Sequence, residues 1–142
     1  LHAMAVTAEA SGLAARLFAD TLAYAGQREQ FGQPIGRFQG ISFKLADMAT
    51  EMRAAELMIL EAGWKYDQGT ITDADMAMAK LKATEMLAFV ADEAIQIHGG
   101  FGYSKEYPAE RHFRDARITQ IYEGTSEIQR IVIARSLLKE VS

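Results

Sequence analysis

FQGISFKLADMATEMRAAELMILEAGWKYDQ, residues Phe38–Gln68, has the strongest periodicity in the chain. Its apolar residues recur at alternating spacings of four and three: Ile41, Leu45, Met48, Met52, Ala55, Ile59, Ala62 and Tyr66. Such a seven-residue repeat lines one face of a long helix and suits packing at about 20° against neighbouring helices. Gly69 follows as a helix C-terminal stop. The stretch therefore predicts one long helix of a bundle.

Two more long helices are expected on either side of this stretch. Residues 2–27 have apolar side chains three and four residues apart, and residues 72–98 have the same pattern. Thr72 with Asp75 resembles a capping box at the start of the later helix. The stripe that we expect this helix to bury is Met76, Ala79, Ala83, Met86, Val90, Ala94 and Ile97.

The C-terminal third predicts a short helix and a final long one. Pro108 suits the first turn of a helix that extends to about Ala116. The last helix is expected to start at Thr125 or Ser126, with Ser126 and Gln129 as a capping box. Residues expected to pack it against the others are Ile128, Ile131, Val132 and Leu138. Together these elements predict one all-α domain over residues 1–142, an up-down four-helix bundle with a short extra helix.

Composition excludes several classes of protein. The chain has 142 residues, no cysteine and a net charge of −4, which predict neither a disulfide framework nor nucleic-acid binding. Its apolar runs are too short to predict a membrane span. A carboxylate-bridged metal site in a ferritin-like bundle needs Glu-x-x-His pairs, and His2, His98 and His112 have no Glu three residues before them. No metal site is expected.

Glu123 is the candidate catalytic residue. It stands between Tyr122 and Gly124, just before the last expected helix. The positive end of that helix favours the carboxylate anion, whereas an apolar wall from Ile121 and Tyr122 would favour the neutral acid. A carboxylate in such a balance can act as a general base toward a C–H proton. The residues alone leave open a simple alternative, an exposed Glu that only the helix dipole stabilises.

Two other segments allow a ligand-binding or a structural interpretation. Arg28, at the end of the first helix, can bind a phosphate or simply complement the helix dipole. Gly99 and Gly100 can let a flat or phosphorylated ligand approach the backbone, or can serve only to end a helix. Phe31 lies in the break over residues 27–36, where it would plug the turn.

Four motifs in order resemble the C-terminal domain of the acyl-CoA dehydrogenase family. They are REQFG at Arg28–Gly32, the segment Phe38–Met48, QIHGGFGY at Gln96–Tyr103, and IYEGTSEIQR at Ile121–Arg130 preceded by RDARIT at Arg114–Thr119. The resemblance covers essentially the whole chain. Short-chain members of the butyryl-CoA type are the most similar.

The resemblance implies a reaction and a set of site residues. Glu123 would abstract the α-proton of an acyl-CoA thioester while the β-hydride passes to FAD, with Tyr122 and Gly124 beside the substrate. Contacts with FAD are implied for Arg28, Phe31, Gln39, Gln96, Ile97, His98, Gly99, Gly100, Thr125, Ser126 and Glu127. Of these, the Arg28 motif and the segment 96–100 would serve the FAD of a neighbouring subunit.

The resemblance also implies partners and a cellular setting. It implies a homo-oligomer, dimer or tetramer, with an electron-transfer flavoprotein as electron acceptor. It implies a role in fatty acid β-oxidation, in the cytoplasm of a bacterium or the mitochondrial matrix of a eukaryote.

Family members also have an N-terminal helical domain and a middle β-domain, which we expect this chain to lack. It opens inside a helical pattern at Leu1, like a piece of a longer protein. The chain alone is therefore expected to be inactive. The alternative function is a non-enzymatic helical oligomerisation module.

Overall fold

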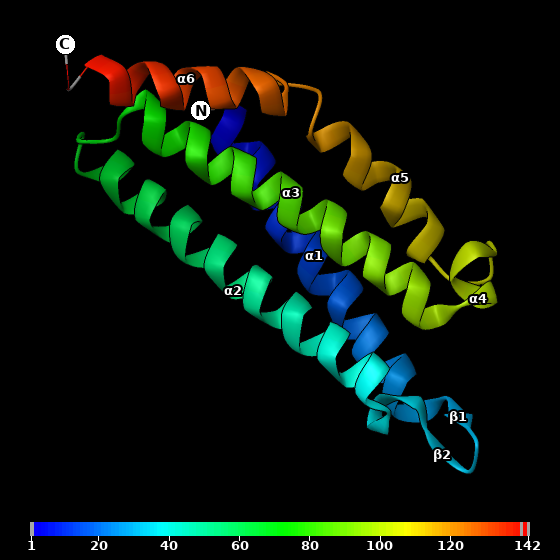
Figure 1. The fold of residues 1–142 in the computed structure, drawn as a ribbon. Helices are drawn as coiled ribbons and strands as arrows, with labels where there is room; N and C mark the ends of the chain where they lie inside the picture. Colours follow the sequence, from blue (N-terminus) through cyan, green and yellow to red (C-terminus); the bar gives the residue numbers. More distant parts are fainter. Residues whose placement is uncertain (1, 140, 142) are drawn as a thin grey trace.

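Three long helices form the body of the molecule (Figure 1). The computed structural model describes residues 2–139 and residue 141. The long helices are α1 (His2–Gln27), α2 (Gln39–Asp67) and α3 (Asp73–His98), and each runs antiparallel to the one before it. Their bounds agree within about a residue with the periodicity of the sequence, which confirms the up-down-up part of the prediction.

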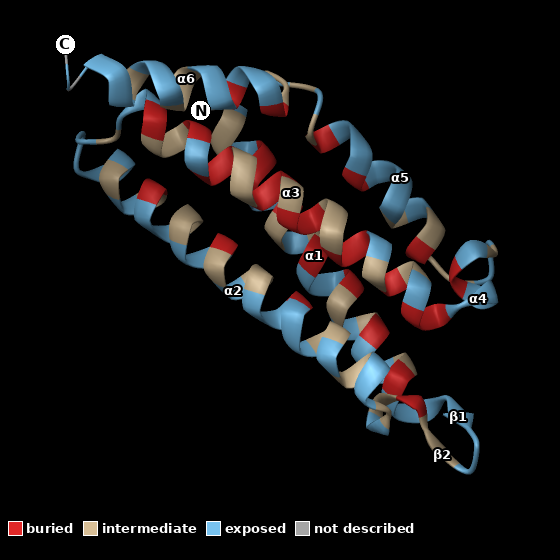
Figure 2. Cartoon of the chain, viewed as in Figure 1, coloured by how far each residue is buried: buried red, intermediate tan, exposed pale blue. Residues whose placement is uncertain are grey.

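Helix α3 is the central element of the fold. It packs against α1, α2, α5 (Ala109–Thr119) and α6 (Ser126–Lys139), and it carries more buried residues than any other described helix (Figure 2). The expected stripe is buried, apart from a half-buried Met76. Residues outside that stripe, such as Leu87 and Ala91, are buried as well. Because helices cover α3 on several sides, one apolar stripe underestimated its burial.

Helix α2 packs with one face only. Within its seven-residue repeat Met48, Ala55 and Ala62 are buried, and most of the other members are half-buried. Tyr66 is 48% exposed, so its predicted burial is wrong. The repeat reaches the end of α2, where the neighbouring helix no longer covers that position. The outer face of α2 leaves large apolar side chains exposed, among them Phe43, Leu57, Leu60 and Trp64.

A tight hairpin joins α1 to α2. Strand β1 (Glu29–Gln30) pairs antiparallel with β2 (Gln33–Pro34), and a short 3-10 helix, η1 (Ile35–Arg37), follows. Phe31 has a φ of 53° and its side chain is 92% exposed, so it does not plug the turn. The hairpin therefore presents Phe31 outward at the end of the bundle.

Helices α5 and α6 together occupy the fourth position of the bundle. Both pack on α3, and in Figure 1 they lie on the side of α3 opposite α2. A four-residue helix, α4 (Gly100–Tyr103), precedes them. Residues 120–125 interrupt the α5–α6 pair halfway along α3, and Glu123 lies in this break.

The start of α6 differs from the prediction. Ser126 and Gln129 do not form a capping box, because Ser126 Oγ is buried without a partner and Gln129 turns back toward the preceding loop. Thr125 Oγ1 instead accepts the Ile128 N–H at 3.4 Å. Burial is reversed as well: Ser126 and Gln129 are buried. Three of the residues expected to pack α6 are exposed: Ile128 by 48%, Ile131 by 43% and Leu138 by 64%.

The predicted capping box of α3 is confirmed. Thr72 Oγ1 accepts the Asp75 N–H at 3.1 Å, and Asp75 Oδ2 accepts the Thr72 N–H at 2.9 Å. Lys65, from the end of α2, donates to Asp75 Oδ1 at 2.7 Å. The Lys65 ammonium and the Thr72 donors lower the pKa of Asp75 from 3.8 to about 2. Asp75 thus connects the end of α2 to the start of α3.

We expect Asp75→Asn to lower the free energy of unfolding by about 1 kcal/mol at pH 7, since it removes a cap and an ion-pair acceptor. Asp75 has a lowered pKa in the folded state, so its contribution is present above about pH 4 and disappears as the pH falls toward 2. Urea unfolding at pH 7 and pH 3 measures both effects. Asp73→Asn is the control, and an equal loss in both variants would contradict the role of Asp75.

Candidate functional site

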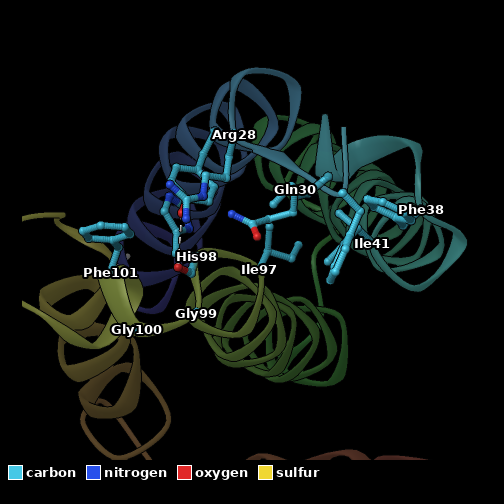
Figure 3. Close-up of a pocket in the computed structure, with 12 residues that line it drawn as sticks. Arg28, Gln30, Phe38, Ile41, Ile97, His98, Gly99, Gly100 and Phe101 are labelled. Atoms are coloured by element: carbon cyan, nitrogen blue, oxygen red, sulfur yellow. Dashed lines mark hydrogen bonds between the residues drawn. The ribbon is translucent and has the colours of Figure 1, made fainter. Parts of the chain in front are cut away.

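One group of predicted site residues meets in a pocket at the end of the bundle. Here α1 and α3 end and the hairpin begins, and a pocket of about 700 Å³ opens between them (Figure 3). The residues that line it are Tyr24, Arg28, Gln30, Phe31, Ile35, Phe38, Ile41, Ile97, His98, Gly99, Gly100 and Phe101. The fold thus brings the REQFG motif together with the segment 97–100, about seventy residues further along the chain.

The pocket is apolar with one cation. Arg28 is the one charged residue among the described residues that line it, and its guanidinium carbon lies 5.7 Å from the centre of the Phe101 ring. Phe38 and Ile41 form the opposite wall in Figure 3. Gly99 has a φ of 60°, and a Cβ at Gly99 or Gly100 would meet nothing within 4 Å. Such a pocket suits a flat aromatic ligand that carries an anionic group.

His98 lies between the pocket and the core. Its ring stacks on Tyr24 with centroids 4.3 Å apart. Nδ1 lies 2.8 Å from the Ala94 carbonyl oxygen, so Nδ1 carries the proton and donates. Tyr24 in turn donates through its hydroxyl to the His98 carbonyl at 3.4 Å. These contacts fix the ring of a buried histidine, and they indicate a positioned wall rather than a proton donor to a ligand.

Two predicted residues lie apart from this pocket, and several of its lining residues were missed. Gln39 starts α2 and Gln96 lies on the outer side of α3, and both are exposed and outside the lining. Sequence reasoning did not assign Gln30, Phe38 or Phe101. Their closeness to the REQFG and glycine motifs was the available signal, because neighbours of a turn often share its pocket.

A second group of predicted residues surrounds Glu123, in the loop between α5 and α6. Glu123 has a φ of 53° and Gly124 has a φ of 89°, so two successive residues are left-handed. The side chain of Glu123 is 46% exposed, and its Oε2 lies 3.7 Å from His2 Nδ1 at the start of α1. Ile121 is also 46% exposed. The expected apolar wall is therefore only partly present in this chain.

Three helices hold the loop that carries Glu123. Tyr122 donates through its hydroxyl to Glu9 Oε2 on α1 at 3.0 Å, and burial followed by this bond raises the pKa of Tyr122. From α6, Gln129 Nε2 donates to the carbonyls of Glu123 at 3.3 Å and Gly124 at 3.1 Å. From α3, Lys80 Nζ donates to the Gly124 carbonyl at 2.7 Å. Backbone and side chains are thus fixed while the carboxylate stays accessible.

Sequence reasoning missed Lys80 completely. Its side chain is only 1% exposed, and burial lowers its pKa. The available signal was a lysine beside Ala79 in the middle of an apolar stripe, since lysine is rarely fully buried. Gln129 was assigned to a cap and turned out to bind the loop.

Thr125, Ser126 and Glu127 border a separate hollow of about 180 Å³. Arg117 and Arg130 also line it. Hydrogen bonds from its own backbone N–H and from Thr125 hold the pKa of Glu127 below its usual value. The three predicted residues therefore lie together, as an anionic and polar edge at the start of α6.

The pocket at Arg28 and the loop at Glu123 lie toward opposite ends of α1. His2 lies beside Glu123 and Tyr24 lines the pocket. At about 1.5 Å per residue, the helix between them spans roughly 33 Å. One small ligand cannot reach both places on the same chain.

Among the described residues, no group of three His, Asp or Glu side chains could hold a metal ion. No helix in residues 2–139 is long and apolar enough to cross a membrane.

Comparisons with known proteins give a consistent result. The family model for the acyl-CoA dehydrogenase C-terminal domain matches residues 2–138. A probable acyl-CoA dehydrogenase of Bacillus subtilis is 53% identical over 136 residues, which cover 96% of this chain and 36% of that protein.

Solved structures agree with the sequence comparisons. The butyryl-CoA dehydrogenase of Megasphaera elsdenii superposes with a TM-score of 0.93 at 48% identity, over 96% of this chain and 36% of that one. A FAD complex of PigA gives a TM-score of 0.89 at 40% identity, over 92% of this chain and 34% of that one. The chain belongs to the acyl-CoA dehydrogenase family, and it corresponds to the C-terminal helical domain. It spans about a third of the length of these relatives.

We expect Gly124→Ala to lower the free energy of unfolding by about 1–3 kcal/mol. A Cβ there would lie 2.8 Å from Gln129 Nε2, and a left-handed φ is unfavourable for alanine. Gly63 provides the matched control, because it lies inside α2 with open space around its Cβ position. Gly63→Ala should stabilise the protein by about 0.5–1 kcal/mol. Urea unfolding compares the two, and equal effects would contradict the steric account.

Proposed function

We propose that this chain is the C-terminal catalytic domain of a FAD-dependent acyl-CoA dehydrogenase and that Glu123 is the base. The carrying observation is the loop at residues 120–125, which is fixed by α1, α3 and α6 and yet presents an accessible carboxylate. Fixed geometry with an accessible base is what proton abstraction from a bound substrate requires. Family membership supports the proposal, since the YEGTS motif stands at this loop.

The chain's own groups would act on the thioester as follows. The Glu123 carboxylate takes the proton from the α-carbon, and negative charge develops on the thioester oxygen. The backbone N–H of Glu123 has no acceptor among the described residues, so it is available to that oxygen. Tyr122 and Gly124 lie beside the acyl group on either side of the base. The class of substrate is an acyl-CoA, and a short acyl chain is supported by the similarity to butyryl-CoA dehydrogenase.

FAD fits the residues present. The pocket at Arg28 offers aromatic and aliphatic walls, a glycine floor and one cation, which suit part of a flavin dinucleotide. FAD, when bound, accepts the hydrogen from the β-carbon as a hydride. The roughly 33 Å between this pocket and Glu123 supports a shared arrangement, in which Arg28 holds the dinucleotide of a neighbouring copy. Thr125 and Glu127 would contact the dinucleotide that serves their own Glu123.

Assembly is part of the proposal. Phe43, Leu57, Leu60 and Trp64 leave an apolar face on α2. A second copy of the chain would cover it, as expected of a dimer or tetramer. An electron-transfer flavoprotein is the proposed acceptor of the reducing equivalents, with β-oxidation of fatty acids as the setting. The alternative is an assembly module without chemistry, for which Glu123 would be dispensable.

The base is tested by Glu123→Gln in the complete natural polypeptide that contains residues 1–142. We expect kcat for acyl-CoA-dependent dye reduction to fall by a factor of at least about 100, since a general base contributes roughly 10²–10⁴. FAD absorbance near 450 nm and the oligomeric state should not change. Glu106→Gln, in the exposed loop before α5, is the matched control. Full activity of Glu123→Gln would refute the proposed base and favour the assembly module.

The chain consisting of residues 1–142 alone should be inactive. It supplies the base and part of a dinucleotide surface, and the rest would have to come from elsewhere. We expect the purified chain to show neither flavin absorbance after incubation with FAD nor dye reduction with butyryl-CoA. Either signal would show that these residues form a complete site.

A further inference from the structure

Lys80 is a buried cation without a carboxylate partner. Its side chain is 1% exposed on α3, and no carboxylate of the described residues lies within ion-pair distance of Nζ. Other lysines of the same part of the fold pair at the surface, as Lys82 does with Glu51. Burying an unpaired charge is expensive, and a methionine would fill this space without that penalty. The position of the charge therefore needs a specific reason.

The partners of Lys80 are both backbone carbonyls of one short segment. Nζ donates to the Gly124 oxygen at 2.7 Å and to the Thr119 oxygen at 3.3 Å. Thr119 is the last residue of α5, and Gly124 follows Glu123 directly. Lys80 thus joins the two ends of the loop that carries the base. A charged donor gives stronger hydrogen bonds than a neutral one.

The backbone between these two carbonyls is strained. Glu123 adopts a left-handed φ of 53°, which is unfavourable for a residue other than glycine. Such strain persists only where the surroundings enforce it. Here Lys80 binds the Gly124 carbonyl from α3, and Gln129 Nε2 binds the same carbonyl from α6 at 3.1 Å. Together the two side chains fix the orientation of the Gly124 carbonyl, and Gln129 Nε2 also binds the Glu123 carbonyl, which belongs to the peptide after Glu123.

We infer that Lys80 is a positioning residue for the base: its buried ammonium holds the Thr119 and Gly124 carbonyls and thereby fixes the direction of the Glu123 carboxylate. This inference rests on the proposed function of Glu123. Lys80 does not touch the substrate, because it lies beneath the loop and within the core. It acts through the backbone and through its charge.

The charge of Lys80 acts on Glu123 from the core side. The two groups interact electrostatically, and the other titratable groups around Glu123 are His2 and Glu9 on α1 and the neighbouring Tyr122. His2 is largely exposed, so solvent screens it. Lys80 is enclosed in the core, so its charge is screened less than that of His2.

The test compares Lys80→Met with Lys82→Met in the complete natural polypeptide. Methionine replaces the buried lysine stem with an uncharged chain of similar shape. For Lys80→Met we expect kcat to fall by on the order of 10- to 100-fold with little change in KM, since the loss appears in the reaction step. In the Glu123→Gln background the same substitution should lower kcat no further, because there is then no base to position. Lys82→Met should change neither quantity.

The outcomes separate this inference from the proposed function. If Glu123→Gln is inactive while Lys80→Met keeps its kcat, the role of Lys80 is refuted and the base stands. If Glu123→Gln is active, the proposed function itself fails. A fall in kcat with a raised KM, or an equal further fall in the Glu123→Gln background, would show that Lys80 is merely structural and would overturn the inference.

A second variant keeps the test decisive if Lys80→Met does not fold. Gln129→Leu removes the other donor to the Gly124 carbonyl and leaves the charge of Lys80 in place. It should lower kcat by roughly 10-fold with little change in KM, because only the geometry of the loop changes. Unaltered kcat in a folded Gln129→Leu protein would overturn the idea that this carbonyl positions the base.

Discussion

The burial of α3 on several sides is the constraint on which the rest of the structure depends. Because α1, α2, α5 and α6 all pack against it, small residues are required wherever a helix approaches closely, as Ala83, Ala91 and Ala94 show. Short side chains bury little apolar area at each contact. The stability of the core therefore comes from many close contacts between helices. Its geometry also determines where the α5–α6 break can lie along α3.

The break between α5 and α6 converts this packing into a site. A continuous fourth helix would satisfy its own backbone groups and would expose only side chains. The interruption frees the carbonyl groups of Thr119, Glu123 and Gly124, and Lys80 and Gln129 bind them. Two left-handed residues can exist there because the loop is bonded at both ends. A core position that would otherwise be apolar has become polar in order to support the loop.

The sequence was sufficient for the long helices and insufficient for the short elements and the contacts. Bounds of the long helices followed from periodicity and from punctuating residues, and the Thr72–Asp75 capping box followed from spacing alone, but α5 ends at Thr119 rather than near Ala116 and the β1–β2 hairpin was not predicted. The rotation of α6 did not follow from the sequence, because both an apolar face with Ile128 and a polar face with Gln129 fit a helical repeat. The rotation of α6 depends on the Gly124 and Glu123 carbonyls, which accept hydrogen bonds from the Gln129 side-chain amide in the interior. Long-range hydrogen bonds of this kind leave no local pattern.

The candidate site likewise combines features that the sequence predicted with contacts that it did not. The REQFG and QIHGG motifs predicted residues that do converge on one pocket, apart from Gln39 and Gln96. Which neighbours complete the pocket depended on the hairpin. A turn at residues 27–36 was predicted, but the pairing of β1 with β2 and the exposure of Phe31 were not. The burial of Lys80 was not predicted, because a single lysine in a helix is normally solvated. Its burial becomes evident only when α5 and α6 cover it.

The outer face of α2 has an optical consequence. Trp64 is the only tryptophan of the chain, and its indole is 63% exposed on that face. The intrinsic fluorescence of the protein therefore reports on the surroundings of α2 rather than on the packing around α3. A blue-shifted emission would signal that another surface has covered Trp64 while the core is unchanged. The chain thus contains a natural spectroscopic probe of association that is largely insensitive to the loop at Glu123.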